Sequence, residues 1–64
     1  MEPYQERVIE EKKSLDEKTQ LLEKFLNTPM CEKVAGEELA RMTEQLYHMR
    51  SYSKVLGERI EAFV

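Results

Sequence analysis

The chain has 64 residues, of which 36% are charged, and its 13 acidic against 10 basic residues give a formal net charge of −3. A chain of this length forms one small domain at most, and its acidic balance argues against binding to duplex nucleic acid, which needs a surplus of lysine and arginine. No apolar run approaches the roughly 20 residues of a membrane span, and the acidic N-terminus lacks the basic-then-apolar order of a signal peptide, so we expect a cytoplasmic protein that binds no membrane.

The size of the core is the second constraint. A single core in a chain shorter than roughly 70–80 residues seldom supplies more than about 3–5 kcal/mol. The chain has one cysteine, Cys31, and one histidine, His48. A lone cysteine closes no intrachain disulfide, and this pair cannot supply the four ligands of a structural zinc site within a monomer. We therefore expect no metal and no cofactor, and we expect self-association into a homo-oligomer.

A first helix is predicted over residues 3–26. Pro3 suits the first helical turn, and good helix formers follow it without a glycine or another proline. Apolar residues recur every seven positions as Met1, Val8, Leu15 and Leu22, with Tyr4 and Phe25 at the intervening offset. Glu11 and Lys18 occupy that offset in the middle of the helix. This polar middle is either a solvated gap or a site.

A second helix is predicted over residues 37–63, after a short capping turn over 29–35. The sequence Asn27-Thr28-Pro29 ends the first helix, because a proline disfavours the helical conformation of the residue before it. The second helix carries a stripe with 3-4 spacing, in which seven of eight positions are apolar. The stripe comprises Leu39, Met42, Leu46, Met49, Ser53, Leu56, Ile60 and Phe63.

The predicted fold class is all-α, with residues 1–64 forming a single helical-hairpin domain. A connection of about ten residues makes two long helices antiparallel neighbours. Reverse pairing places Tyr4 near Phe63, Leu15 near Met49 and Ser53, and Leu22 near Met42.

A second apolar stripe lies beside the main stripe of the second helix. It contains Tyr52 and Val55, with His48, Arg59 and Ala62 at compatible offsets. A hairpin with one buried face has no use for this stripe, so we expect it to contact other copies in a homo-oligomeric helical bundle. The predicted interface residues are Tyr52, Val55, Ala62 and Phe63.

The sequence shows no catalytic constellation, because it has no Gly-rich phosphate loop and no nucleophile beside a histidine and an acid. We therefore expect that the protein is not an enzyme. Three smaller features have two interpretations each. Ser53 and Gly57 either admit another helix closely or mark positions where little packs. His48 with Glu44 is either a tuned acid–base pair or an ion pair, and Cys31 is either a reactive thiol or a small apolar filler.

The segment 47–54 is the basic, aromatic part of an otherwise acidic chain. Aromatic rings stack on bases, and arginine or lysine binds phosphates, so this composition suits a nucleotide-like anion. The alternative is that Tyr52 packs at an interface while the basic side chains are solvated. The candidate ligand-binding residues are Tyr4, Arg7, His48, Arg50, Tyr52, Lys54 and Arg59.

Several motifs resemble a family of very short phage-encoded proteins related to a crAss-like-phage protein. The resemblance rests on Pro-Tyr-Gln-Glu-Arg-Val-Ile-Glu-Glu-Lys at 3–12, Leu-Asp-Glu-Lys at 15–18, Leu-Glu-Lys-Phe at 22–25 and Met-Arg-Ser-Tyr-Ser-Lys-Val-Leu-Gly-Glu-Arg-Ile at 49–60. By size and fold type the hairpin is also similar to the helical hairpins of phage anti-CBASS and anti-Thoeris sponge proteins. Those proteins assemble into oligomers and hold immune signals in pockets between protomers.

The resemblance implies a phage counter-defence sponge in the infected bacterial host. Such a protein would bind and sequester a cyclic-nucleotide or ADP-ribose-type immune signal without hydrolysing it. The rival hypothesis is a small coiled-coil module that inhibits or links host or phage proteins, with the face around Tyr52 and Val55 as its docking surface. The sequence alone leaves the number of subunits and the identity of the ligand open.

Overall fold

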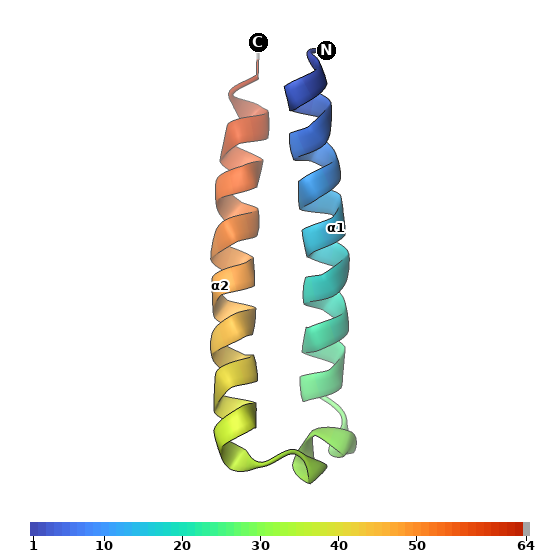
Figure 1. The fold of residues 1–64 in the computed structure, drawn as a ribbon, viewed down its shortest axis with the longest axis vertical. Helices are drawn as coiled ribbons and strands as arrows, with labels where there is room; N and C mark the ends of the chain where they lie inside the picture. Colours follow the sequence, from blue (N-terminus) through green and yellow to red (C-terminus); the bar gives the residue numbers. More distant parts are fainter. Residues whose placement is uncertain (64) are drawn as a thin grey trace.

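The computed structural model describes residues 1–63 and shows two long antiparallel helices joined at one end by a short 3₁₀ helix. Helix α1 spans Pro3–Leu26, η1 spans Pro29–Lys33 and α2 spans Gly36–Glu61 (Figure 1). The predicted all-α hairpin is confirmed, and the described residues contain no strand. The predicted second helix, 37–63, is displaced slightly, and residue 64 of the predicted domain lies outside the described residues.

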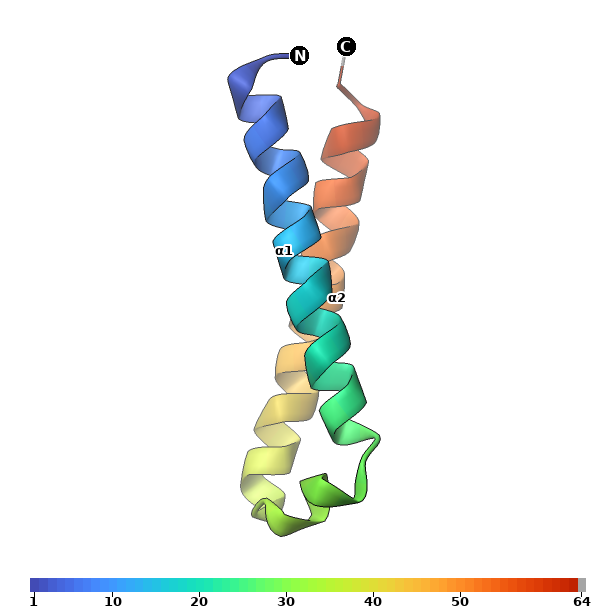
Figure 2. The same ribbon diagram turned by 90° about the vertical axis from the view of Figure 1, so that its right-hand side faces the viewer.

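The two helices lie side by side along their whole length. Both termini lie at one end, called here the open end, and η1 lies at the other end, called the tip (Figure 1). In the view of Figure 2, α1 passes in front of α2 and crosses it at a shallow angle. The principal extents of 46 × 14 × 14 Å describe a rod rather than a globule.

Local hydrogen bonds explain where α1 begins and ends. At its start, the backbone N–H of Glu2 donates to Gln5 Oε1 at 2.9 Å, which satisfies one of the donors that a helix leaves unpaired. At its end, Asn27 Nδ2 donates to the carbonyl of Glu23 at 3.0 Å, and Thr28 Oγ1 donates to the carbonyl of Phe25 at 2.8 Å. Pro29 then cannot continue the helix, so the chain turns.

The line of residues through which each helix packs against the other is called here its seam. The seam of α2 is the predicted stripe. Leu46 and Leu56 are buried and the other six positions of the stripe are half-buried. The predicted pairing of Tyr4 with Phe63 is also confirmed, because their rings meet edge to face with centroids 5.9 Å apart.

The prediction for α1 is wrong in the middle of the helix, although Tyr4 at one end does meet Phe63. The residues that face α2 between the apolar heptad positions are Gln5, Lys12 and Thr19, and Glu11 and Lys18 are exposed. The prediction assumed that Glu11 and Lys18, at the offset of the aromatic residues, face α2. Helix α1 is instead rotated by one position, so that the residue after each of them faces α2. Burial of these polar groups costs little because local partners satisfy them, as when Thr19 Oγ1 donates to the Leu15 carbonyl at 2.7 Å.

The core of the hairpin is small. Among the described residues, the buried apolar side chains are Val8, Leu46 and Leu56. The accessible surface is 5112 Å², whereas a compact monomer of 7.6 kDa exposes about 4,300 Å². The excess of roughly 800 Å² agrees with the expectation that the chain buries further surface by association, which stays a prediction.

Candidate functional site

A polar network occupies the middle of the seam. Lys12 Nζ donates to Asp16 Oδ2 at 2.8 Å and to Ser53 Oγ at 3.1 Å, while Ser53 Oγ donates to Asp16 Oδ1 at 2.5 Å. The hydrogen bond from Lys12, and then the one from Ser53, lowers the pKa of the Asp16 carboxyl below its ordinary value of 3.8, because both stabilise the carboxylate. The network links α1 to α2 through the Ser53 hydroxyl.

The network explains why small residues stand at positions 53 and 57. A Cβ at Gly57 would lie 3.3 Å from Lys12 Cε, so the stem of Lys12 crosses α2 at this glycine. The small residues therefore admit a side chain of the same hairpin. The sequence interpretation missed Lys12 and Asp16, although the i, i+4 spacing of a lysine and an aspartate was a signal for the ion pair.

The hairpin has two lateral sides, which the seam positions define. Glu23 and Arg50 each directly follow an apolar seam residue, and Arg50 Nη2 lies 2.7 Å from Glu23 Oε2, so both face the side called here the Arg50 side. Residues that directly precede any seam position face the opposite side, called the Tyr52 side, because successive helical residues are rotated by about 100°. The Tyr52 side carries Tyr4, Arg7, Glu11, Ser14, Lys18, Leu21 and Phe25 from α1, and Glu38, Arg41, Gln45, His48, Tyr52, Val55, Arg59 and Ala62 from α2.

The structure divides the seven candidate ligand-binding residues between these sides. Five of them share the Tyr52 side, namely Tyr4, Arg7, His48, Tyr52 and Arg59. Arg50 and Lys54 lie on the Arg50 side, where Glu23 already pairs with Arg50. One ligand therefore cannot use all seven on a single hairpin, and the role of each in binding stays a prediction.

His48 contacts its own helix neighbours. Its Nε2 lies 3.6 Å from Glu44 Oε1, and its ring meets that of Tyr47 edge to face, with centroids 5.4 Å apart. Both side chains of the ion pair are about two-thirds exposed or more, at 66% and 72%. This geometry fits the ion-pair interpretation of His48.

The Tyr52 side is positively charged although the protein is acidic. Its four basic residues, Arg7, Lys18, Arg41 and Arg59, face two acidic ones, Glu11 and Glu38, which gives a local charge of +2 against −3 for the chain. Arg41 pairs with Glu38 at 2.8 Å. The other three cations form no salt bridge with another residue of 1–63. Lys18 joins this group because of the rotation of α1, which the sequence did not reveal.

The same side exposes much of the apolar surface. Of seven large apolar side chains that are exposed within residues 1–63, four lie there: Tyr4 at 49%, Leu21 at 68%, Tyr52 at 46% and Val55 at 51%. Of the predicted interface residues, Tyr52, Val55 and Ala62 are exposed, whereas Phe63 is half-buried against Tyr4 within the hairpin. Basic and apolar groups therefore share one surface.

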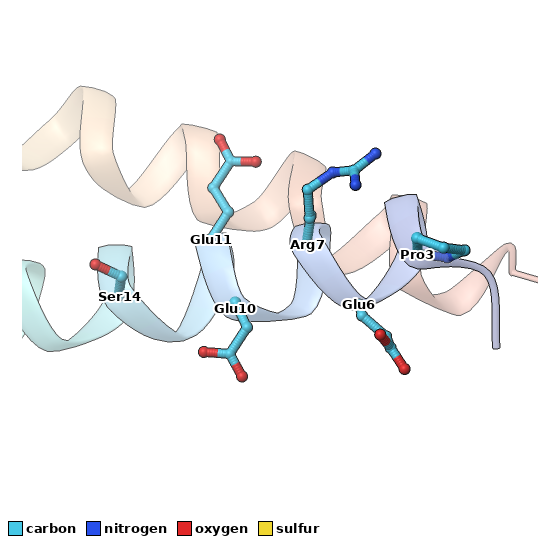
Figure 3. Close-up of a pocket in the computed structure, with 6 residues that line it drawn as sticks. All are labelled: Pro3, Glu6, Arg7, Glu10, Glu11 and Ser14. Atoms are coloured by element: carbon cyan, nitrogen blue, oxygen red, sulfur yellow. The ribbon is translucent and has the colours of Figure 1, made fainter.

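A hollow on the surface of the single chain lies on the outer face of α1 and shares Arg7, Glu11 and Ser14 with the edge of the Tyr52 side. Figure 3 shows its lining, with Arg7 and Glu11 pointing to one side of the helix and Glu6 and Glu10 to the other. Its lining residues are Pro3, Glu6, Arg7, Glu10, Glu11 and Ser14. One helix supplies all of them, and three carboxylates against one guanidinium make the hollow unsuitable for a phosphate.

Three other possibilities are a metal site, the Cys31 thiol and a membrane-spanning helix. Within residues 1–63, no three His, Cys, Asp or Glu side chains are arranged to hold a metal ion. The half-buried Cys31 thiol donates to the carbonyl oxygen of Leu26 at 3.6 Å. Neither α1 nor α2 is apolar enough over its length to cross a bilayer.

Comparison with known proteins identifies the family but adds no relative of known structure. No solved structure and no curated protein matches the chain. The model of one family, Sequestin, matches residues 2–62, which covers both helices and the tip. The chain therefore belongs to the Sequestin family.

Proposed function

We propose that this protein is a phage counter-defence sponge that binds a cyclic-nucleotide or ADP-ribose-type immune signal and holds it without hydrolysing it. The name Sequestin itself denotes sequestration of a ligand or partner. The observation that carries the proposal is the Tyr52 side, which has a charge of +2 and exposed aromatic rings on a chain of net charge −3. An acidic protein that gathers cations and aromatic rings on one side offers a surface for an aromatic anion.

Each group on this side matches a part of a nucleotide. Tyr4 can stack on a base, which is worth about 1–3 kcal/mol, whereas Tyr52 either stacks in the same way or packs between copies. Arg7 and Arg59 can donate to phosphate oxygens, and each such charged hydrogen bond contributes about 1.5–3 kcal/mol. The carboxylate of Glu11 can accept hydrogen bonds from ribose hydroxyls, as acidic residues do in dinucleotide sites.

Tight binding also requires enclosure. Ligand pockets usually bury about 70–90% of a ligand's surface, whereas the Tyr52 side of one hairpin is open. We therefore propose that the working form is a homo-oligomer in the cytoplasm of the infected bacterium, with each signal molecule bound between copies. Its predicted interface includes the exposed residues Tyr52, Val55 and Ala62.

Binding without turnover fits the groups in the central network. Ser53 lies 3.1 Å from Lys12 Nζ, a spacing found in serine–lysine nucleophile pairs. Here, however, the Ser53 hydroxyl donates its proton to Asp16, and the Lys12 ammonium donates to both, so neither atom is available as a general base. The network is structural, and we propose that the protein has no catalytic residue.

Calorimetry of the purified protein against cyclic dinucleotides, cyclic trinucleotides and ADP-ribose derivatives tests the proposal. We expect saturable binding of at least one compound, which chromatography then recovers intact. Arg59→Gln should weaken that binding by at least tenfold, whereas Lys24→Gln, a matched change on the outer face of α1, should leave it unchanged. A folded protein that binds nothing in the panel would refute the proposal, and a recovered breakdown product would refute binding without turnover.

The second candidate is a protein-binding module, an inhibitor or adaptor of a host or phage protein. It is favoured by the exposed side chains of Leu21, Tyr52 and Val55, which form an apolar surface of the kind found at interfaces. On this hypothesis Tyr52→Ala weakens capture of the partner, and no small molecule changes the melting temperature. A ligand-dependent increase in melting temperature would favour the sponge instead.

A further inference from the structure

The basic and apolar groups of the Tyr52 side occupy different parts of its length. Arg7 and Arg59 lie toward the open end, whereas Tyr52, Val55 and Leu21 lie nearer the middle. Along α2, Arg59 is seven residues from Tyr52, which is about 10 Å at 1.5 Å per residue. The apolar middle can therefore be covered while the basic end remains able to bind a ligand.

The area of this side sets the overlap that a second copy needs. A side of 46 by 14 Å has a footprint of roughly 640 Å², and stable interfaces bury about 800 Å² on each partner. The excess surface of the hairpin over a compact monomer is of the same size, roughly 800 Å². A contact between two ends would be too small, so two hairpins must overlap along most of their length.

Charge decides between the two ways of overlapping. In a parallel pair, the open ends coincide, so Arg7, Arg59 and Glu11 of both copies converge and place four guanidinium groups and two carboxylates together, a net charge of +2. In an antiparallel pair, each open end lies over the partner's tip half, where Glu38 already pairs with Arg41 at 2.8 Å. Like charges in one interface cost several kcal/mol by an order-of-magnitude rule, so the antiparallel arrangement is favoured.

We propose that two copies pair antiparallel through the Tyr52 side, about a twofold axis near Tyr52, and that each copy completes the other's ligand site. Residues of α2 at equal distances before and after Tyr52 then face one another across the pair. Arg59, seven residues after Tyr52, therefore faces Gln45 of the second copy, seven residues before it. On α1, Glu11 faces Phe25 of the second copy by the same rule about Lys18. Lys18 holds the same position relative to the seam of α1 as Tyr52 does in α2, so it meets its own equivalent near the axis, where its long stem carries the ammonium group out to solvent.

The two equivalent pockets would each combine a basic end and a covering wall. Arg7, Glu11 and Arg59 of one copy supply groups for phosphate and ribose, and Phe25 and Gln45 of the other supply a ring for stacking and an amide for a base edge. The assignment of these groups to a nucleotide rests on the proposed function. The pairing itself does not, because it follows from area and charge.

Cross-linking without ligand tests the pairing in a Cys31→Ser background. Arg59→Cys is mixed with Gln45→Cys and treated with a short bis-maleimide, and the control is Arg59→Cys mixed with Glu11→Cys. An antiparallel pair should give the mixed dimer in the first mixture and little in the second. A parallel pair would give the reverse and overturn the proposal, as would a monomer in sedimentation at micromolar concentration.

Two measurements keep this inference separate from the proposed function. Val55→Asp should convert the dimer to a monomer in sedimentation while circular dichroism still shows helix, and an unchanged dimer would contradict the chosen interface. Phe25→Ala should lower ligand affinity at least tenfold within an intact dimer. A dimer with the expected cross-links that binds no compound would refute the sponge alone, and a monomer that binds a compound with full affinity would refute the pairing alone.

Discussion

The replacement of Gly57 by alanine measures how firmly Lys12 is held in the seam. Gly57 lies inside α2, where glycine is about 0.8–1.0 kcal/mol less favourable than alanine. Opposing this gain, the new Cβ would lie 3.3 Å from Lys12 Cε, which is tighter than an ordinary contact of 3.4–4 Å. The stem of Lys12 must therefore move by a few tenths of an ångström.

This movement weakens the hydrogen bonds of Lys12 Nζ, at 2.8 Å to Asp16 and 3.1 Å to Ser53, without breaking them. A partly exposed ion pair contributes about 0–1 kcal/mol, so we assign its weakening about half of that range. The expected net effect of Gly57→Ala is a stabilisation of about 0.5 kcal/mol, or roughly 2–4 °C in Tm for a domain of this size. In a Lys12→Ala background the full gain of about 1 kcal/mol should appear.

Thermal unfolding followed by circular dichroism measures both effects, at one fixed protein concentration because association shifts Tm. Gly36→Ala is the control, since nothing lies within 4 Å of a Cβ there and its effect should be the same in both backgrounds. An equal gain from Gly57→Ala in both backgrounds would show that Lys12 does not pack against Gly57. A loss greater than about 1 kcal/mol in the native background would show that Lys12 cannot move.

Three further changes test the network, the core and the Arg50 side. The pKa of Asp16 is lowered in the folded state, so its contribution to stability should be present above pH 3.8 and lost as the pH falls through the folded pKa. Asp16→Asn should therefore flatten this part of an acid-unfolding curve. An unchanged curve would contradict the network. Replacing Leu56, which is 1% exposed, by alanine should cost about 2–5 kcal/mol and remove most of the helical signal at 37 °C. Met30→Ala, at an exposed position of the tip, should change stability by less than about 0.5 kcal/mol. Arg50→Gln breaks a half-exposed pair worth about 0–1 kcal/mol and should leave calorimetric ligand affinity unchanged, and a loss of binding would return Arg50 to the site.

The second helix could be predicted in detail because its pattern has one solution. Its eight stripe positions keep 3-4 spacing, and Ser53 is the one polar residue among them. Whichever way the helix is rotated, a single face can bury that set. The end of α2 was less certain, since it ends at Glu61 without a glycine or proline to mark the boundary.

The first helix offered two solutions, and the pattern favoured the wrong one. The heptad residues Val8, Leu15 and Leu22 lie in the seam under either rotation, so the intervening residues decide. One rotation buries Glu11 and Lys18, and the other buries Lys12 and Thr19. Both pairs of residues are polar, so neither rotation gives an apolar middle. The first rotation was preferred because Tyr4 and Phe25 lie at the same offset as Glu11 and Lys18. What distinguishes them is a contact with α2, the hydrogen bonds of Lys12 and Ser53 across 41 residues of sequence.

The candidate site depended on how α2 distributes its side chains around the helix. Residue type alone placed all the basic and aromatic residues of the segment 47–54 in one set, but a helix distributes eight consecutive residues around its whole circumference. Arg50 and Lys54 therefore face away from Tyr52. The proximity of Tyr4 to the end of α2 could be predicted, because it requires only that the helices be antiparallel.

The polar seam of α1 explains the small core. Gln5 accepts a hydrogen bond from the backbone N–H of Glu2, Thr19 donates to the carbonyl of Leu15, and Lys12 donates to Asp16. Each of the three polar side chains therefore finds a hydrogen-bond partner within about one turn of its own helix. This lets α1 pack against α2 through polar residues at little cost, but it removes apolar area from the core. The same rotation places Lys18, together with Arg7 on the same helix, on the side that Arg59 and Tyr52 already occupy. Lys18 and Glu11 carry opposite charges, so a helix rotated by one position to bury them would remove no net charge from the Tyr52 side. The rotation therefore accounts for the small core, whereas the net charge of +2 comes from Arg7, Arg41 and Arg59 against Glu38.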